Sequence, residues 1–140
     1  MNLRLTVRVG LLVALPALVA AINAYQPPTF TIAGRVTGGS GRHPLYVALW
    51  SDQGFLVTPA QTIHLPPGTE GHYRFIVPSG RWGVSAFENV NENGRLDMGM
   101  FGPKEPNGFW REFRGHHKPR FDEIAVLVDR DLTDANITLR

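Results

Sequence analysis

Short runs of alternating apolar and polar residues recur from residue 30 to the C-terminus, and glycine, proline or asparagine residues separate them. Residues 45–50 differ in being almost continuously apolar, as in a strand that is buried on both faces. No segment beyond the first two dozen residues has the spacing of an amphipathic helix. The pattern predicts an all-β, seven-stranded antiparallel Greek-key sandwich, transthyretin-like or immunoglobulin-like, with strands at residues 30–36, 45–50, 61–65, 72–77, 81–87, 121–128 and 135–139.

The first 24 residues have the layout of a secretory signal peptide. Arg4 and Arg8 precede an apolar run, Val9–Ala21, which is shorter than the roughly 20 residues that a membrane-spanning helix needs. Cleavage after Ala21 or after Ala24 fits the small residues there, and retention of the segment as an anchor is the alternative. We therefore expect a signal peptide at 1–24, a lead-in at 25–29 and a single domain at 30–140, with no membrane span after cleavage.

Charge and cysteine content narrow the class of protein. Residues 1–24 contain two of the 14 basic residues, so the remainder has 12 basic and 12 acidic residues. This balance gives no support to a nucleic-acid partner. The chain has no cysteine, which excludes a lipid-attached N-terminal cysteine and means that an exported domain would be stabilised without disulfides. We expect a secreted or periplasmic bacterial protein.

The segment Asn89–Asp97 is the strongest candidate for chemistry. Oxygen-bearing side chains stand at the first, third, fifth and ninth positions and glycine at the sixth, as in the front of a calcium-binding EF-hand loop. The twelfth position is Met100 in place of the closing glutamate, and only one of the four side chains is charged. Two interpretations stay open: a weak Ca²⁺ site, or a ladder of Asx turns that needs no ion. The candidate metal ligands are Asn89, Asn91, Asn93 and Asp97.

The same segment carries a family resemblance. From Gly80 onward the chain resembles a bacterial secreted family, domain of unknown function 2141, in which a loop Asp-x-Asn-x-Asn-Gly-x-Leu-Asp follows a strand that contains an aromatic residue. Here the leading aspartate is Asn89, and Glu88 stands where the family often has histidine. The resemblance implies a small exported β-sandwich and brings no activity. Its further matching segments are Gly102–Phe109, Pro119–Ala125 and Ile137–Leu139.

A second candidate site lies in residues 103–120, where aromatic residues alternate with basic ones. Such a segment suits an anionic glycan, a lipid headgroup or a phosphate. The alternative is a long loop whose aromatic side chains fill the core. The candidate ligand-binding residues are Trp110, Arg111, Arg114, His116, His117 and Lys118.

No nucleophile or zinc motif is evident, so the sequence favours a non-enzymatic binding or structural role in the cell envelope. An envelope protein or a glycan is the expected partner. Two alternatives remain: a carbohydrate-binding module that uses Trp110 or Trp82, which requires an exposed ring, and a hydrolase that uses Glu105 and Asp97 as carboxylates, which requires both to face one cleft.

Overall fold

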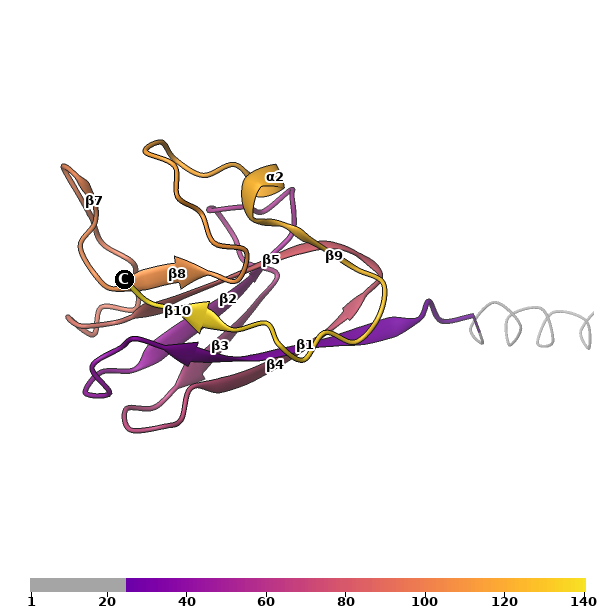
Figure 1. Ribbon diagram of the computed structural model, residues 1–140, viewed down its shortest axis with the longest axis horizontal. Coiled ribbons are helices and arrows are strands. Elements are labelled where there is room, and N and C mark those ends of the chain that lie inside the picture. Colours follow the sequence, from indigo (N-terminus) through magenta and orange to yellow (C-terminus); the bar gives the residue numbers. More distant parts are fainter. Residues whose placement is uncertain (1–24) are drawn as a thin grey trace, which may run out of the picture.

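The computed structural model describes residues 25–140, and its fold is mostly β, as predicted (Figure 1). Each of the first five predicted strands is present, with ends that agree within one residue. The alternation of apolar and polar residues therefore predicts these five strands correctly. These strands are β1 (Thr29–Thr37), β2 (Leu45–Trp50), β3 (Gln61–Leu65), β4 (His72–Pro78) and β5 (Gly80–Glu88).

Two sheets form the body of the domain. The smaller has the order β10-β1-β4 and the larger has the order β3-β2-β5-β8, with β9 paired to the beginning of β5. All pairs in these sheets are antiparallel except β1 with β10, which is parallel. The later strands are β8 (Asn107–Phe109), β9 (Val126–Val128) and β10 (Ile137–Thr138).

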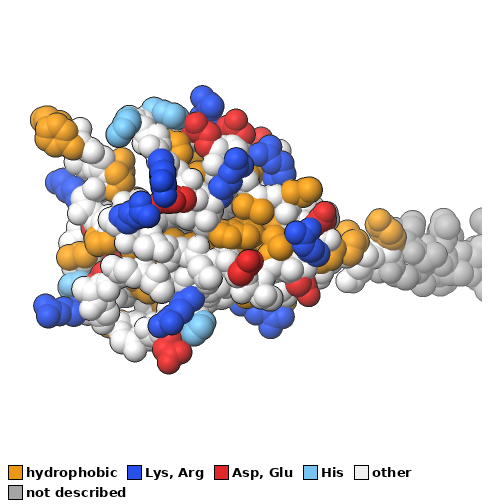
Figure 2. Space-filling view, in the orientation of Figure 1, with side chains coloured by type: hydrophobic (Ala, Val, Ile, Leu, Met, Phe, Trp, Pro, Cys, Tyr) orange, Lys and Arg blue, Asp and Glu red, His pale blue; other side chains and the backbone are white. Residues whose placement is uncertain are grey.

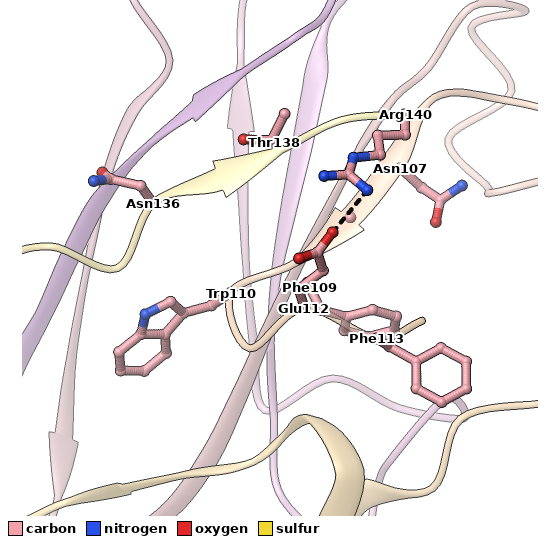
Figure 3. Close-up of a pocket in the computed structure, with 9 residues that line it drawn as sticks. Asn107, Phe109, Trp110, Glu112, Phe113, Asn136, Thr138 and Arg140 are labelled. Atoms are coloured by element: carbon pink, nitrogen blue, oxygen red, sulfur yellow. Dashed lines mark ion pairs between the residues drawn. The ribbon is translucent and has the colours of Figure 1, made fainter. Parts of the chain in front are cut away.

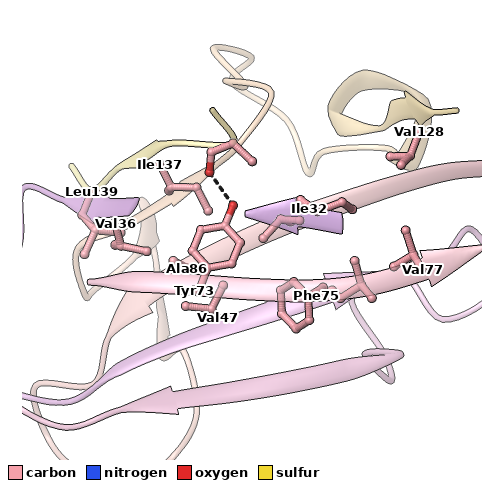
Figure 4. Close-up of a cluster of buried hydrophobic side chains, with 13 residues drawn as sticks. Ile32, Val36, Val47, Tyr73, Phe75, Val77, Ala86, Val128, Ile137 and Leu139 are labelled. Atoms are coloured by element: carbon pink, nitrogen blue, oxygen red, sulfur yellow. Dashed lines mark hydrogen bonds between the residues drawn. The ribbon is translucent and has the colours of Figure 1, made fainter. Parts of the chain in front are cut away.

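The main core lies between the two sheets. In β4, Tyr73, Phe75 and Val77 are buried while the residues between them are exposed, because successive side chains of a strand point to opposite faces. They share one apolar cluster with residues of β2 and β5 (Figure 4). The hydroxyl of Tyr73 donates a hydrogen bond to the backbone carbonyl of Ala135, which satisfies the polar atom inside the core and ties β4 to the chain leading into β10.

The two sheets are joined along one side by the end of the chain. Asn107 and Arg140 exchange two backbone hydrogen bonds, with N–O distances of 3.1 and 3.0 Å. This pair connects β8 of the larger sheet to the residue just beyond β10 of the smaller one. The opposite edges, β3 and β4, have no further strand beside them within residues 25–140. The arrangement is thus closed on one side and open on the other.

A second apolar cluster covers the larger sheet, and here the prediction of a strand over residues 121–128 was wrong in its first half. Phe121–Ile124 forms one helical turn, α2, and only Val126–Val128 is a strand. Phe121 and Ile124 lie three residues apart, so one turn of helix puts both on the buried face. Glu123 stabilises the turn because its carboxylate accepts the backbone N–H of Arg120 at 2.8 Å.

Residues 98–119, where the sequence analysis predicts no strand, contain three short strands. β6 (Met98–Gly99) and β7 (Gly102–Pro103) form a separate two-stranded hairpin, and β8 joins the larger sheet. Segments of two or three residues are too short to show a period of two. The described residues thus contain ten strands where seven were predicted.

Residues 1–24, to which the predicted signal peptide belongs, lie outside the described residues. Between residues 25 and 140, no helix is long and apolar enough to cross a membrane.

Candidate functional site

The Asn89–Asp97 loop begins where β5 ends, and its first residue is fixed in place. Asn89 is buried, and its backbone N–H donates to the carbonyl of Pro44 at 2.9 Å. Gly94 has φ +76°, a left-handed conformation that favours glycine, and a Cβ there would lie 3.6 Å from the ring of Tyr46. The loop therefore turns tightly over the ring of Tyr46 at the beginning of β2.

Three of the four predicted ligands lie together. The side-chain amides of Asn91 and Asn93 both donate to the carboxylate of Asp97, the latter at 3.0 and 3.1 Å. These bonds, first from Asn93 and then from Asn91, lower the pKa of Asp97 below its ordinary value of 3.8, and the nearby cations Arg95 and Lys104 act in the same direction. The charge of Asp97 is thus balanced by amide hydrogens.

Asn89 is separate from this cluster. Its Oδ1 accepts the backbone N–H of Gly94 at 3.3 Å, which is a bond within the turn. The Oδ1 atoms of the other two asparagines also accept local N–H groups, that of Asn93 at 3.3 Å on Asn91 and that of Arg95 at 2.9 Å on Asn93. The contacts are those of Asx turns, and the loop satisfies its own polar atoms.

Glu105 closes the loop from outside it. Its side chain is only 6 % exposed, and its Oε1 accepts the N–H groups of Val90 and Asn91 at 2.9 and 3.4 Å. Its Oε2 accepts the N–H of Asp97 at 3.3 Å. One buried carboxylate therefore holds both ends of the loop. The sequence did not predict this role, because the β6–β7 hairpin sets the distance along the chain at which Glu105 returns.

The hydrogen bonds of Glu105 and Asp97 test whether these two carboxylates could act as the acid and base of a hydrolase. Glu105 and Asp97 are neighbours, yet both oxygens of Glu105 are bonded to backbone N–H groups and the Asp97 carboxylate is bonded to two amides. An acid or base needs an oxygen that reaches a substrate proton. These contacts favour a structural role for both residues.

A second buried carboxylate lies at the start of the loop. Glu88 accepts the backbone N–H of Ser40 at 2.8 Å and also the Ser40 hydroxyl. A Cβ at Gly39 would come within 2.9 Å of Oε2 of Glu88, so this glycine permits the approach. The contact fastens the loop between β1 and β2 to the end of β5.

A groove of about 350 Å³ lies over β8 and β10. Figure 3 shows Glu112 and Arg140 meeting across it, 2.7 Å apart, with Trp110 and Phe113 on either side. Glu112 also pairs with Arg114 at 2.9 Å, and this guanidinium and then Arg140 lower the pKa of the Glu112 carboxyl. Apolar rings, amides and charges thus surround one shallow space. The lining residues are Asn107, Gly108, Phe109, Trp110, Glu112, Phe113, Asn136, Thr138 and Arg140.

Of the predicted ligand-binding residues, only Trp110 lines this groove. Arg111 instead donates to the carbonyls of Asp122 and Ala125 at 3.3 and 3.2 Å, which fastens the segment to α2. His117 contacts Glu123 at 3.0 Å. Arg114, His116 and Lys118 are exposed.

The two tryptophans that the sequence analysis proposed for carbohydrate binding are half-buried. Trp110 and Trp82 both pack against the main core, and the indole N–H of Trp82 donates to the carbonyl of Pro78 at 3.0 Å. Trp82 is not part of the groove.

Comparison with known proteins gives one match. The family described as "Uncharacterized protein conserved in bacteria (DUF2141)" matches residues 44–136, which include β2 to β9 and both the loop and most of the groove. No curated protein and no solved structure matches the chain.

Proposed function

The chain belongs to the bacterial family DUF2141, and from this premise we propose that it is an exported, non-enzymatic binding module of the cell envelope. Export is supported by the signal-like residues 1–24. We also propose that residues 30–140 fold as one Greek-key sandwich, with the mostly β fold and the shared core between two sheets as support.

The ligand of this module is a glycan, bound in the groove over β8 and β10. The observation that carries this assignment is the set of side chains that share the groove. Trp110 and Phe113 offer apolar surface for the C–H face of a sugar ring, and Thr138 offers a hydroxyl group. Asn136 offers its Nδ2 hydrogens, since its Oδ1 accepts the backbone N–H of Arg35 at 3.0 Å. The ion pair of Glu112 with Arg140 adds charged partners of both signs.

Binding to insoluble polysaccharides tests this assignment. The protein is sedimented with purified peptidoglycan, chitin or cellulose, and the bound fraction is measured. Thr138→Lys places a long side chain in the groove, whereas Thr62→Lys makes the same change on the exposed face of β3. We expect Thr138→Lys to weaken binding by about tenfold or more and Thr62→Lys to leave it unchanged. Equal binding by the two variants, or sedimentation with none of the three polysaccharides, refutes the groove as a glycan site.

Calcium binding at the Asn89–Asp97 loop stays a prediction. Three of the predicted ligands share one place, which fits a cation, but the amides of Asn91 and Asn93 present nitrogen to Asp97. Coordination would require these amides to rotate and give up the local bonds of their oxygens. With one formal charge among the ligands, we expect an affinity near the millimolar end of calcium sites.

Calorimetric titration and thermal melting measure this affinity. With a Kd of about 1 mM, 10 mM calcium stabilises the folded state by about 1.4 kcal/mol, and a chelator removes the effect. Asp97→Asn removes the only charge of the cluster and abolishes the response. The calcium site is excluded when 10 mM calcium gives no heat and the same melting temperature as the chelator.

A further inference from the structure

The β6–β7 hairpin ends in a bare apolar tip. Met98 pairs with Pro103 and Gly99 with Gly102, so Met100 and Phe101 form the two-residue turn. Met100 is 92 % exposed, Phe101 99 % and Met98 66 %. Figure 2 shows apolar side chains projecting at the upper left, where Figure 1 places β7.

Local folding does not explain these residues. Two-residue hairpin turns favour asparagine, aspartate and glycine, because their backbone reaches positive φ at little cost. Methionine and phenylalanine bring no such advantage, and neither Met100 nor Phe101 belongs to either apolar cluster within residues 25–140. A projecting apolar tip on a water-soluble surface marks a contact with something else.

Two cations lie next to the hairpin, on the side away from its tip. Arg95 and Lys104 flank the hairpin, and neither forms an ion pair with any residue from 25 to 140. A Cβ at Gly99 would lie 3.2 Å from Cγ and Cε of Lys104, so the lysine stem runs along the hairpin. This is the arrangement of a side chain whose stem lies on apolar surface while its ammonium group stays in a polar layer.

The other basic residues on the upper edge in Figure 2 are mostly paired already. In residues 111–120, Arg114 pairs with Glu112, and Arg120 pairs with Asp122 and Glu123. Arg111 donates to two backbone carbonyls, so Lys118 is the one lysine or arginine of this segment without a partner within residues 25–140. Figure 2 shows acidic side chains among the lysine, arginine and histidine side chains along this edge. The negative charges of the loop itself are Glu92, which is exposed, and Asp97, whose carboxylate is bonded to amides.

We propose that the tip Met98–Phe101 inserts into the interfacial layer of an anionic lipid bilayer, while Arg95 and Lys104 contact the headgroup phosphates. The charge complementarity favours a lipid surface. The apolar side chains lie at the end of the hairpin and the cations lie nearer to its base, and in a bilayer the acyl chains likewise lie deeper than the phosphates. The tip does not line the glycan groove, so the two proposals stand independently.

A single fluorescent label tests the insertion. The chain has no cysteine, so Phe101→Cys creates one site for an environment-sensitive probe such as NBD in the full-length protein. The matched control is Ile76→Cys, at an exposed apolar residue of β4. The label reports only its own surroundings, which separates the tip from any lipid binding by the apolar residues 9–21. We expect phosphatidylglycerol vesicles to shift the emission of the label at position 101 to shorter wavelength and to leave that at position 76 unchanged.

Two further variants in the labelled Phe101→Cys protein separate the apolar and charged parts. Arg95→Gln with Lys104→Gln raises the lipid concentration at half-maximal response by about tenfold or more, since each cation near an anionic surface adds to binding. Met100→Ser raises it as well. The proposal is overturned by an unchanged emission with phosphatidylglycerol, by an equal response to neutral phosphatidylcholine vesicles, or by a shift that follows protein concentration without lipid, which would assign the tip to a second copy of the chain.

Discussion

Replacing Glu105 by glutamine tests whether this residue holds the Asn89–Asp97 loop. The carboxylate accepts three backbone N–H groups from a nearly buried position, at 2.9, 3.4 and 3.3 Å. Glutamine keeps one acceptor oxygen but turns an NH₂ group toward at least one donor. Hydrogen bonds to a charged acceptor contribute about 1.5–3 kcal/mol each, and the two longer ones less.

We therefore expect Glu105→Gln to lower the free energy of unfolding by about 2 kcal/mol, and Glu105→Ala, which removes every acceptor, by about 3–4 kcal/mol. For a domain of this size, 2 kcal/mol moves the urea midpoint down by about 1 M. Urea unfolding followed by tryptophan fluorescence measures the change. Amide hydrogen exchange at Val90 and Asp97 locates it, because these amides lose their acceptor.

The matched control is Glu92→Gln. It makes the same chemical change in the same loop, on an exposed side chain that accepts no hydrogen bond from residues 25–140. We expect an unchanged midpoint. Should Glu105→Gln unfold at the same urea concentration as Glu92→Gln, the carboxylate does not hold the loop and the reasoning fails.

Two other measurements check the packing and the electrostatics. Gly34→Ala should lower the melting temperature severely or prevent folding, because a Cβ there would lie 1.9 Å from the carbonyl oxygen of Ala135 and would force β1 away from the last strand. Thermal melting measures this effect. Ala33→Gly is the nearby control for a change in backbone flexibility. Asp97 has a lowered pKa, so its contribution to stability is present above about pH 3.8 and is lost as pH falls through the lower folded-state value. The stability of Asp97→Asn should therefore fall less steeply below pH 3.8 than that of the unchanged protein in acid titrations followed by urea unfolding, and parallel curves would contradict the assignment.

Alternation predicts the fold where a strand is long enough to show it. β4 has seven residues and its buried positions follow the apolar ones, so its ends and its inner face could be read from the sequence. The turn at Phe121–Ile124 has only four residues, and a helical spacing of three cannot be told from an irregular strand over so short a run. The hairpin strands β6 and β7 have two residues each and give no signal at all.

In the candidate site, too, the sequence predicts only the contacts between residues that are close in the chain. Asn91, Asn93 and Asp97 could be predicted to meet, because a turn at Gly94 brings nearby residues together. The role of Glu105 depends on the β6–β7 hairpin, and the groove depends on the pairing of Asn107 with Arg140, which joins segments far apart in the chain. Contacts of this kind are set by tertiary structure, so local patterns do not reveal them.

The parallel pairing of β1 with β10 has a consequence for how the chain folds. Thr31 and Arg35 in β1 donate to side chains 100 and 101 residues later, and Val36 pairs with Ile137. The first strand can pair with β4 early, but it obtains its second neighbour only after residues 137–138 have been synthesised, and contacts of such long separation slow folding. Until Ile137 and Leu139 reach the core, the chain lacks two of its buried residues, and the partly folded state exposes apolar surface that chaperones can bind.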